Sequence, residues 1–86
     1  MILKNFIDGQ YLDNDSGKTF DVINPANGEL AYQVEVADEK IRTAAIKSSQ
    51  QGFEIWSAMT GLERNRILLK AVSLLRERND ELAAIE

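Results

Sequence analysis

Few residues of this 86-residue chain could carry out chemistry. It contains no cysteine and no histidine, so it lacks a thiolate nucleophile and the commonest general base near neutral pH. Ser48 and Ser49 therefore have no base to activate them, and we expect them to serve packing rather than catalysis. No glycine-rich phosphate-binding pattern occurs in the sequence. The sequence thus predicts no catalytic and no cofactor-binding residue within these 86 positions.

Two groups of charged residues are candidates for ion-binding sites. The run Asp13-Asn14-Asp15 lacks the glycine and the closing glutamate of a calcium-binding EF-hand loop, so we interpret residues 13–18 as an exposed loop. The arginines of the last third alternate with acids, a pattern more typical of a solvated, salt-bridged helix surface than of a phosphate site. These arginines are Arg64, Arg66, Arg76 and Arg78.

The composition argues against several classes of binding partner. A hydrophobic share of 44% is ordinary for a folded soluble protein, and a net charge of −4 argues against nucleic-acid binding. No apolar run approaches the roughly 18 residues that a membrane span needs, and the first residues lack the apolar core of a signal peptide. We therefore expect a cytoplasmic chain with no nucleic-acid partner and no membrane partner.

Residues 1–36 predict two β-hairpins. Asp8-Gly9 lies between two short apolar runs and suits a type I′ turn, in which both central residues need positive φ. The segment Asn24-Pro25-Ala26-Asn27-Gly28 predicts a second turn, between a strand over 19–23 and one over 29–36. Residues 29–36 alternate in the period of a half-buried strand, with Leu30, Tyr32, Val34 and Val36 on one face.

Two helices are predicted after the hairpins, which together give an α+β fold ending in a helical hairpin. Asp38 suits the N-cap of a helix over 38–57. Thr60 and Glu63 have the spacing of a capping box for a second helix over 60–86, with a candidate break near 78–79. The buried face of the first helix is expected to contain Ile41, Ala44, Ala45, Ser48, Ser49, Gly52, Phe53, Ile55 and Trp56.

The second helix carries more apolar surface than the rest of the chain can cover. One continuous arc consists of Ile67, Leu68, Ala71, Val72, Leu74 and Leu75. The sequence also ends at Glu86 in strong helix formers without a C-cap signal. We expect the chain to be the front part of a longer protein. The alternative is a complete small helical-hairpin module that docks a partner and has no enzymatic activity.

Several phrases resemble the amino terminus of the NAD(P)-dependent aldehyde dehydrogenases, and the resemblance extends over essentially all 86 residues. Two sections carry it most clearly, the first over residues 6–29 and the second around Trp56 and Glu63-Arg64. Within the family, residues 56–60 and 75–83 are most similar to the betaine aldehyde dehydrogenases. The phrases of the first section are FIDGQY (6–11), SGKTF (16–20) and INPANGE (23–29).

The resemblance implies that residues 1–86 begin the α/β cofactor-binding domain of an enzyme that oxidises an aldehyde with NAD or NADP. For the betaine branch, the reaction converts betaine aldehyde to glycine betaine. The family's catalytic and cofactor-binding residues have no counterpart within the chain, so we expect it to be inactive alone. Its expected partner is the remainder of the parent chain, and the isolated chain is expected to self-associate through its apolar helix faces.

One family site overlaps the chain. The resemblance implies that the main-chain carbonyls of Val22 and Ile23 contribute to a monovalent-cation site, usually potassium. Carbonyl oxygens suit hard cations whatever the side chain. From the residues alone, both positions are simply strand residues.

Overall fold

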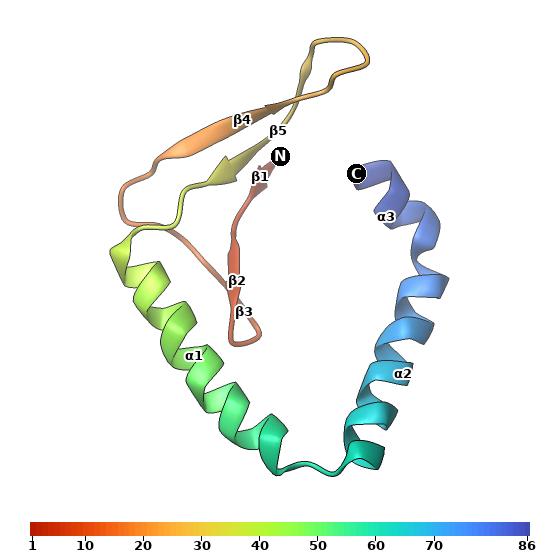
Figure 1. Ribbon diagram of the computed structural model, residues 1–86. Coiled ribbons are helices and arrows are strands. Elements are labelled where there is room, and N and C mark those ends of the chain that lie inside the picture. Colours follow the sequence, from red (N-terminus) through yellow and green to blue (C-terminus); the bar gives the residue numbers. More distant parts are fainter. The chain divides into compact units, whose positions relative to one another are not determined.

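The chain forms short strands followed by helices in a computed structural model that describes all 86 residues. The elements divide between two compact units, Met1–Gly52 and Phe53–Glu86. None of the helices combines the length and the apolar character needed to cross a bilayer. In chain order the elements are β1 (Ile2–Leu3), β2 (Asn5–Ile7), β3 (Gln10–Leu12), β4 (Thr19–Ile23), β5 (Leu30–Glu35), α1 (Glu39–Ala58), α2 (Gly61–Glu77) and α3 (Asn79–Ile85) (Figure 1).

The first predicted hairpin is confirmed. Strands β2 and β3 pair antiparallel, and the turn between them has φ of 53° at Asp8 and 75° at Gly9. Positive φ at both central positions is what a type I′ turn requires. The rings of Phe6 and Tyr11 face each other across the strands, with centroids 5.0 Å apart, and this pair helps to fix the register.

The second hairpin, β4–β5, is also confirmed, but its register contains an irregularity. Val22 pairs with Tyr32 and Ile23 pairs with Leu30, so Ala31 is an extra residue that forms a β-bulge. The bulge interrupts the alternation expected for this strand. Leu30 lies beyond it and is 54% exposed, so its predicted burial was wrong.

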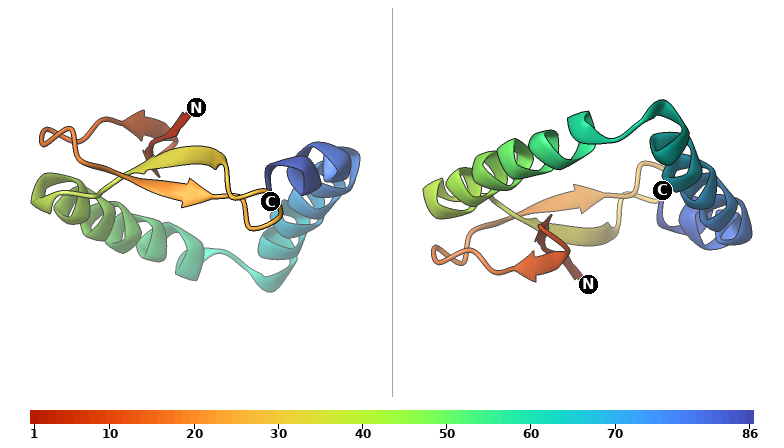
Figure 2. Two further views of the ribbon diagram at one scale, coloured as in Figure 1. Left: turned by 90° about the horizontal axis from the view of Figure 1, so that it is seen from above. Right: turned by 90° about the horizontal axis from the view of Figure 1, so that it is seen from below.

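The sheet that contains β4 and β5 has a third strand, β1, which the sequence analysis did not predict. It pairs in parallel with β5, Ile2 opposite Gln33 and Leu3 opposite Val34, which gives a sheet in the order β1-β5-β4. Figures 1 and 2 show these strands side by side. Sequence patterns missed β1 because it is only two residues long and its parallel partner is distant in the chain.

The loop between β3 and β4 is not the wholly exposed turn that its composition suggested. Asn14 is only 9% exposed. Its Nδ2 donates to the carbonyls of Lys18 at 2.9 Å and Val36 at 2.8 Å, and its Oδ1 accepts from the Gly17 amide at 3.2 Å. We call these three hydrogen bonds the Asn14 network; they attach the loop to the end of β5.

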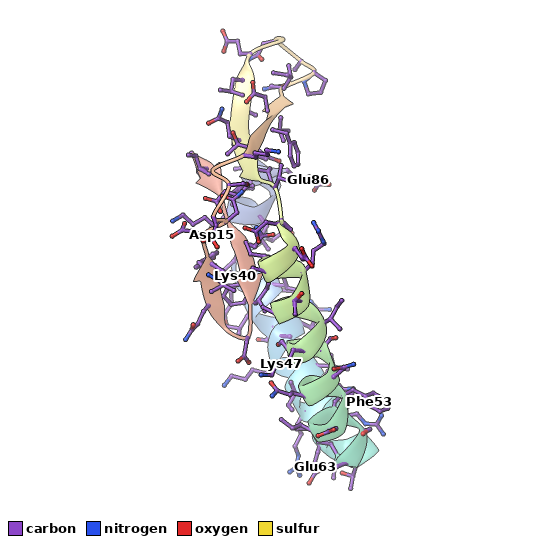
Figure 3. The ribbon with its side chains drawn as sticks, turned by 90° about the vertical axis from the view of Figure 1, so that its left-hand side faces the viewer. Asp15, Lys40, Lys47, Phe53, Glu63 and Glu86 are labelled. Atoms are coloured by element: carbon purple, nitrogen blue, oxygen red, sulfur yellow. The ribbon has the colours of Figure 1, made fainter.

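Asp38 begins α1 and also holds the same loop. Its Oδ1 accepts from the amide of Ile41 at 2.9 Å, as an N-cap does, and its Oδ2 accepts from the amide of Asp15 at 2.8 Å. These two bonds lower the pKa of Asp38 below its usual range. The stability they contribute is therefore present above the unfolded-state pKa and is lost as the pH falls through the folded-state pKa. Figure 3 shows Lys40 beside Asp15, 3.5 Å from its carboxylate.

Burial along α1 is less extensive than its apolar face suggested. Ile41 is 3% exposed and is the buried hydrophobic residue of the chain, while Trp56 is half-buried. Phe53 and Ile55 were expected in the core but are 71% and 64% exposed, and Figure 3 shows the Phe53 side chain extending from the helix. Periodicity identified the apolar face correctly, but no residue of the chain covers its end.

Helix α2 begins as predicted. The Thr60 hydroxyl accepts from the Glu63 amide at 3.2 Å, and the Glu63 carboxylate accepts from the Thr60 amide at 2.8 Å, so both bonds of the capping box are present. The predicted break also occurs: α2 ends at Glu77, Arg78 has φ −105° and ψ 18°, and α3 begins at Asn79.

Replacing Thr60 by alanine should weaken the start of α2. The loss of an N-cap side chain typically costs about 1 kcal/mol. Urea unfolding followed by far-ultraviolet circular dichroism should show a lower midpoint for Thr60→Ala than for Thr60→Ser, which keeps the hydroxyl. Equal midpoints for the two variants would show that the capping box does not stabilise α2.

Candidate functional site

Histidine and cysteine are absent from the sequence, and the acidic residues do not gather into a group of three or more that could hold a metal ion. The features left to explain are surfaces. The first is mainly apolar, the second is lined by both apolar and polar residues, and the third is an exposed strand edge.

The first surface is the apolar arc of α2. All six of its residues are exposed, and Leu75 is 57% exposed. Burying one such side chain fully contributes roughly 1.5–3 kcal/mol to stability. A partner that covered the whole arc would therefore add a large stabilisation. Contiguous apolar patches of this kind usually mark an interaction surface. We call this arc the α2 stripe; it consists of Ile67, Leu68, Ala71, Val72, Leu74 and Leu75.

The α2 stripe continues across the helix break. A groove of about 330 Å³ is lined by Ala71, Leu74, Leu75, Arg78 and Leu82, with mainly apolar walls. The break at Arg78 therefore allows α2 and α3 to line one groove.

An exposed ion pair lies at this break. The Arg78 guanidinium donates to both carboxylate oxygens of Glu81, with Nε 2.9 Å from Oε2 and Nη2 2.5 Å from Oε1. The same pair holds the pKa of Glu81 below its usual range. Its two parallel bonds have the bidentate geometry that gives arginine–carboxylate pairs their directionality.

The second surface is a groove of about 290 Å³ in the first unit, between the β2–β3 hairpin and α1. Ile7 and Leu12 contribute from the hairpin, and Ala44 and Ser48 contribute from the small-residue face of α1. The short side chains at these α1 positions leave the space. The remaining walls are polar: Asp8, Gln10, Lys47 and Gln51.

The third feature concerns the carbonyls of Val22 and Ile23. The Val36 amide donates to the Lys18 carbonyl at 2.9 Å. Lys18 and every second residue after it along β4 therefore direct their backbone groups toward β5. By this alternation the Val22 carbonyl lies in the ladder. The Ile23 carbonyl lies on the open edge, because β4 is at the edge of the sheet.

Neutral carbonyl oxygens of this kind suit a monovalent cation in their chemistry. Ile23 is the better placed of the two residues to offer one. Two carbonyls alone do not complete a coordination shell, so any such site needs oxygen ligands from elsewhere.

The chain is similar to known proteins both in sequence and in structure. The model of the aldehyde dehydrogenase family matches residues 11–86. The structure is also similar to that of a putative methylmalonate-semialdehyde dehydrogenase from Sinorhizobium meliloti 1021, determined in complex with NAD. The TM-score is 0.88 and the sequence identity 33%; the match covers 98% of this chain and 17% of that chain. The chain thus spans about a sixth of the length of the solved structure that it matches.

Proposed function

Because this chain belongs to the aldehyde dehydrogenase family, we propose that it is the amino-terminal scaffold segment of an NAD(P)-dependent aldehyde dehydrogenase. The α2 stripe is the observation that carries the proposal. Its six residues are exposed although they form one continuous apolar face, and the remainder of the parent chain is the partner that would cover them. The match over only 17% of a dehydrogenase chain supports the same assignment.

The proposed role of these residues is structural. The hairpins and helices pack on the rest of the cofactor-binding domain and help to hold it in shape, while residues outside the chain bind the aldehyde and the cofactor. NAD or NADP accepts the hydride when the aldehyde is oxidised to an acid. With no cysteine, the 86 residues contribute no thiolate nucleophile, and with no histidine they lack the commonest general base, so the chain alone is expected to show no turnover.

For the substrate we propose betaine aldehyde, on the similarity of residues 56–60 and 75–83 to the betaine branch. Methylmalonate semialdehyde is the second candidate, because the solved structure that the chain matches is a putative dehydrogenase of that aldehyde. None of the residues described here is assigned to substrate contact, so residues elsewhere in the parent would make the choice.

The experiment is a substrate comparison on the purified full-length protein that contains this segment. NADH and NADPH formation is measured with betaine aldehyde, methylmalonate semialdehyde and an unbranched aliphatic aldehyde. We expect the highest kcat/KM with betaine aldehyde. A higher value with methylmalonate semialdehyde would replace the proposed substrate, and no oxidation of any aldehyde would contradict the enzyme assignment and favour the interaction-module alternative.

We also propose that Val22 and Ile23 contribute carbonyls to a potassium site in the parent enzyme. The position of Ile23 on the open edge of β4 supports this. Potassium chloride should then raise the thermal unfolding midpoint of the full-length protein above its value in N-methylglucamine chloride of the same ionic strength. Equal midpoints in the two salts would contradict the cation site.

A further inference from the structure

The turn between β4 and β5 contains two asparagines in the same local geometry. Oδ1 of Asn24 accepts from the Ala26 amide at 2.9 Å, and Oδ1 of Asn27 accepts from the Glu29 amide at 3.0 Å. In each case the side-chain oxygen bonds the second amide along the chain, as in an Asx-turn. Cyclisation requires the side-chain carbonyl carbon to approach the backbone nitrogen of the intervening residue.

The two intervening nitrogens differ in their chemistry. The nitrogen after Asn24 belongs to Pro25, and a proline nitrogen carries no hydrogen that could be lost. The nitrogen after Asn27 belongs to Gly28, and it does carry a hydrogen. Gly28 has φ of 73°, and its amide donates to the Asn24 carbonyl at 2.8 Å, so this hydrogen bond must open before the proton is lost.

We propose that Asn27 is a modification site that deamidates through a cyclic imide formed with Gly28. Hydroxide removes the Gly28 amide proton, and the nitrogen forms a bond to Cγ of Asn27. The Cγ–Nδ2 bond then breaks, and Nδ2 takes up a proton and leaves as ammonia. Water opens the imide at either carbonyl to give aspartate or isoaspartate, and no oxidant or reductant is needed.

The turn favours this reaction at the step where charge develops. Cγ of Asn27 becomes tetrahedral during the attack, and negative charge builds on Oδ1. The Glu29 amide already donates to that oxygen at 3.0 Å, so the donor is in place before the reaction begins. The same arrangement exists at Asn24, but Pro25 prevents the attack there.

The other asparagines lack this combination. Asn14 is 9% exposed, and its Nδ2 donates to two carbonyls, which hold the amide in place. Asn5 lies in β2, and Asn65 and Asn79 lie in α2 and α3. Regular strand and helix backbone does not fold the side chain over the next nitrogen as the Asx-turn does. Asn27 and Gly28 also form the one Asn-Gly pair of the chain.

The modification would alter the turn itself. The Gly28 amide donates to the Asn24 carbonyl at 2.8 Å, and the imide nitrogen has no hydrogen with which to make that bond. The aspartate product places a new charge beside Glu29, and the isoaspartate product lengthens the main chain by one carbon. The hydrogen bond from the Asn24 amide to the Glu29 carbonyl, at 2.8 Å, would remain to close the hairpin.

The test is incubation of the full chain at mildly alkaline pH, followed by peptide mapping with mass spectrometry that separates aspartate from isoaspartate. Asn27 should convert first, to both products, at a rate that rises with hydroxide concentration. Asn24 should remain unchanged. Faster conversion at another asparagine, or no conversion at Asn27, would overturn the proposal.

Three variants separate the turn chemistry from general loss of structure. Asn27→Gln should abolish conversion at this position, and Gly28→Ala should slow it by roughly tenfold, which corresponds to about 1.4 kcal/mol of added barrier. Pro25→Gly supplies the missing N–H after Asn24 and should create a second reactive site there. If Pro25→Gly leaves Asn24 as stable as before, while Asn27 still converts, the turn geometry does not promote the reaction.

The same incubation in urea isolates the contribution of the folded turn. The Glu29 amide holds Oδ1 only in the folded chain, so conversion of Asn27 should be slower in urea at equal pH. Conversion that is as fast or faster in urea would overturn the contribution of the turn.

Discussion

Replacing Leu75 by glutamate is expected to change stability little in the isolated 86-residue chain and to destabilise strongly the full-length dehydrogenase proposed above. In the isolated chain, the Leu75 side chain is 57% exposed, so a charge there meets water and should change the free energy of unfolding by no more than about 0.5 kcal/mol. In the full-length protein, the same position would be buried against further polypeptide. Loss of a buried leucine alone costs about 2–5 kcal/mol, and an unpaired buried charge adds to that.

The isolated chain should also become less associated. The α2 stripe is an exposed apolar surface of the second unit, and we propose that copies of the chain cover it in one another when nothing else does. Sedimentation velocity at high micromolar concentration should show the unsubstituted chain above its monomer mass of 9.7 kDa. The Leu75→Glu chain should sediment closer to that mass.

Ser73→Glu is the matched control. Ser73 is exposed and lies on the opposite, polar side of α2. It is two positions before Leu75, and at about 100° per residue this is a rotation of about 200° around the helix axis. It should be nearly neutral both in sedimentation and in urea unfolding of the full-length protein. If Leu75→Glu destabilises the full-length protein no more than Ser73→Glu does, the α2 stripe is not the surface that docks on the parent.

The features that sequence reasoning predicted correctly depend on residues close together in the chain. Asp8-Gly9 supplies both positive φ angles of its turn, and Thr60 with Glu63 makes both bonds of the capping box. Each is determined by a few neighbouring residues, so no knowledge of tertiary partners was needed. The break at Arg78 belongs to the same class.

The features that it missed depend on distant residues. The pairing of β1 with β5 and the extra residue at Ala31 have no local signal. The exposure of Phe53 shows a different limit: periodicity identifies which side of a helix is apolar, but it does not tell whether the chain contains anything to cover it. The groove beside Ala44 was not predicted from the sequence.

Asn14 is the clearest residue that the sequence did not reveal, and it carries the second large prediction. Asn14→Ala should destabilise the first unit by about 1–3 kcal/mol, because it removes the Asn14 network and leaves part-buried backbone groups without partners. The Val36 carbonyl and the Gly17 amide lose this partner, whereas the Lys18 carbonyl keeps its hydrogen bond from the Val36 amide. Urea unfolding of the chain measures this loss. Hydrogen exchange of the Val36 amide, which donates to the Lys18 carbonyl at 2.9 Å, should become faster.

Two further variants decide whether the amide itself is responsible. Asp13 lies in the same loop and forms an exposed ion pair with Lys4. Asp13→Ala removes this pair and should change stability little, because water screens such pairs. Asn14→Asp keeps an oxygen for the Gly17 amide but faces the carbonyls of Lys18 and Val36 with a second oxygen in place of Nδ2. It should therefore destabilise at least as much as Asn14→Ala. If Asn14→Ala and Asp13→Ala were equally mild, the loop would be held by Asp38 through Asp15, and the buried position of Asn14 would be a consequence of that attachment.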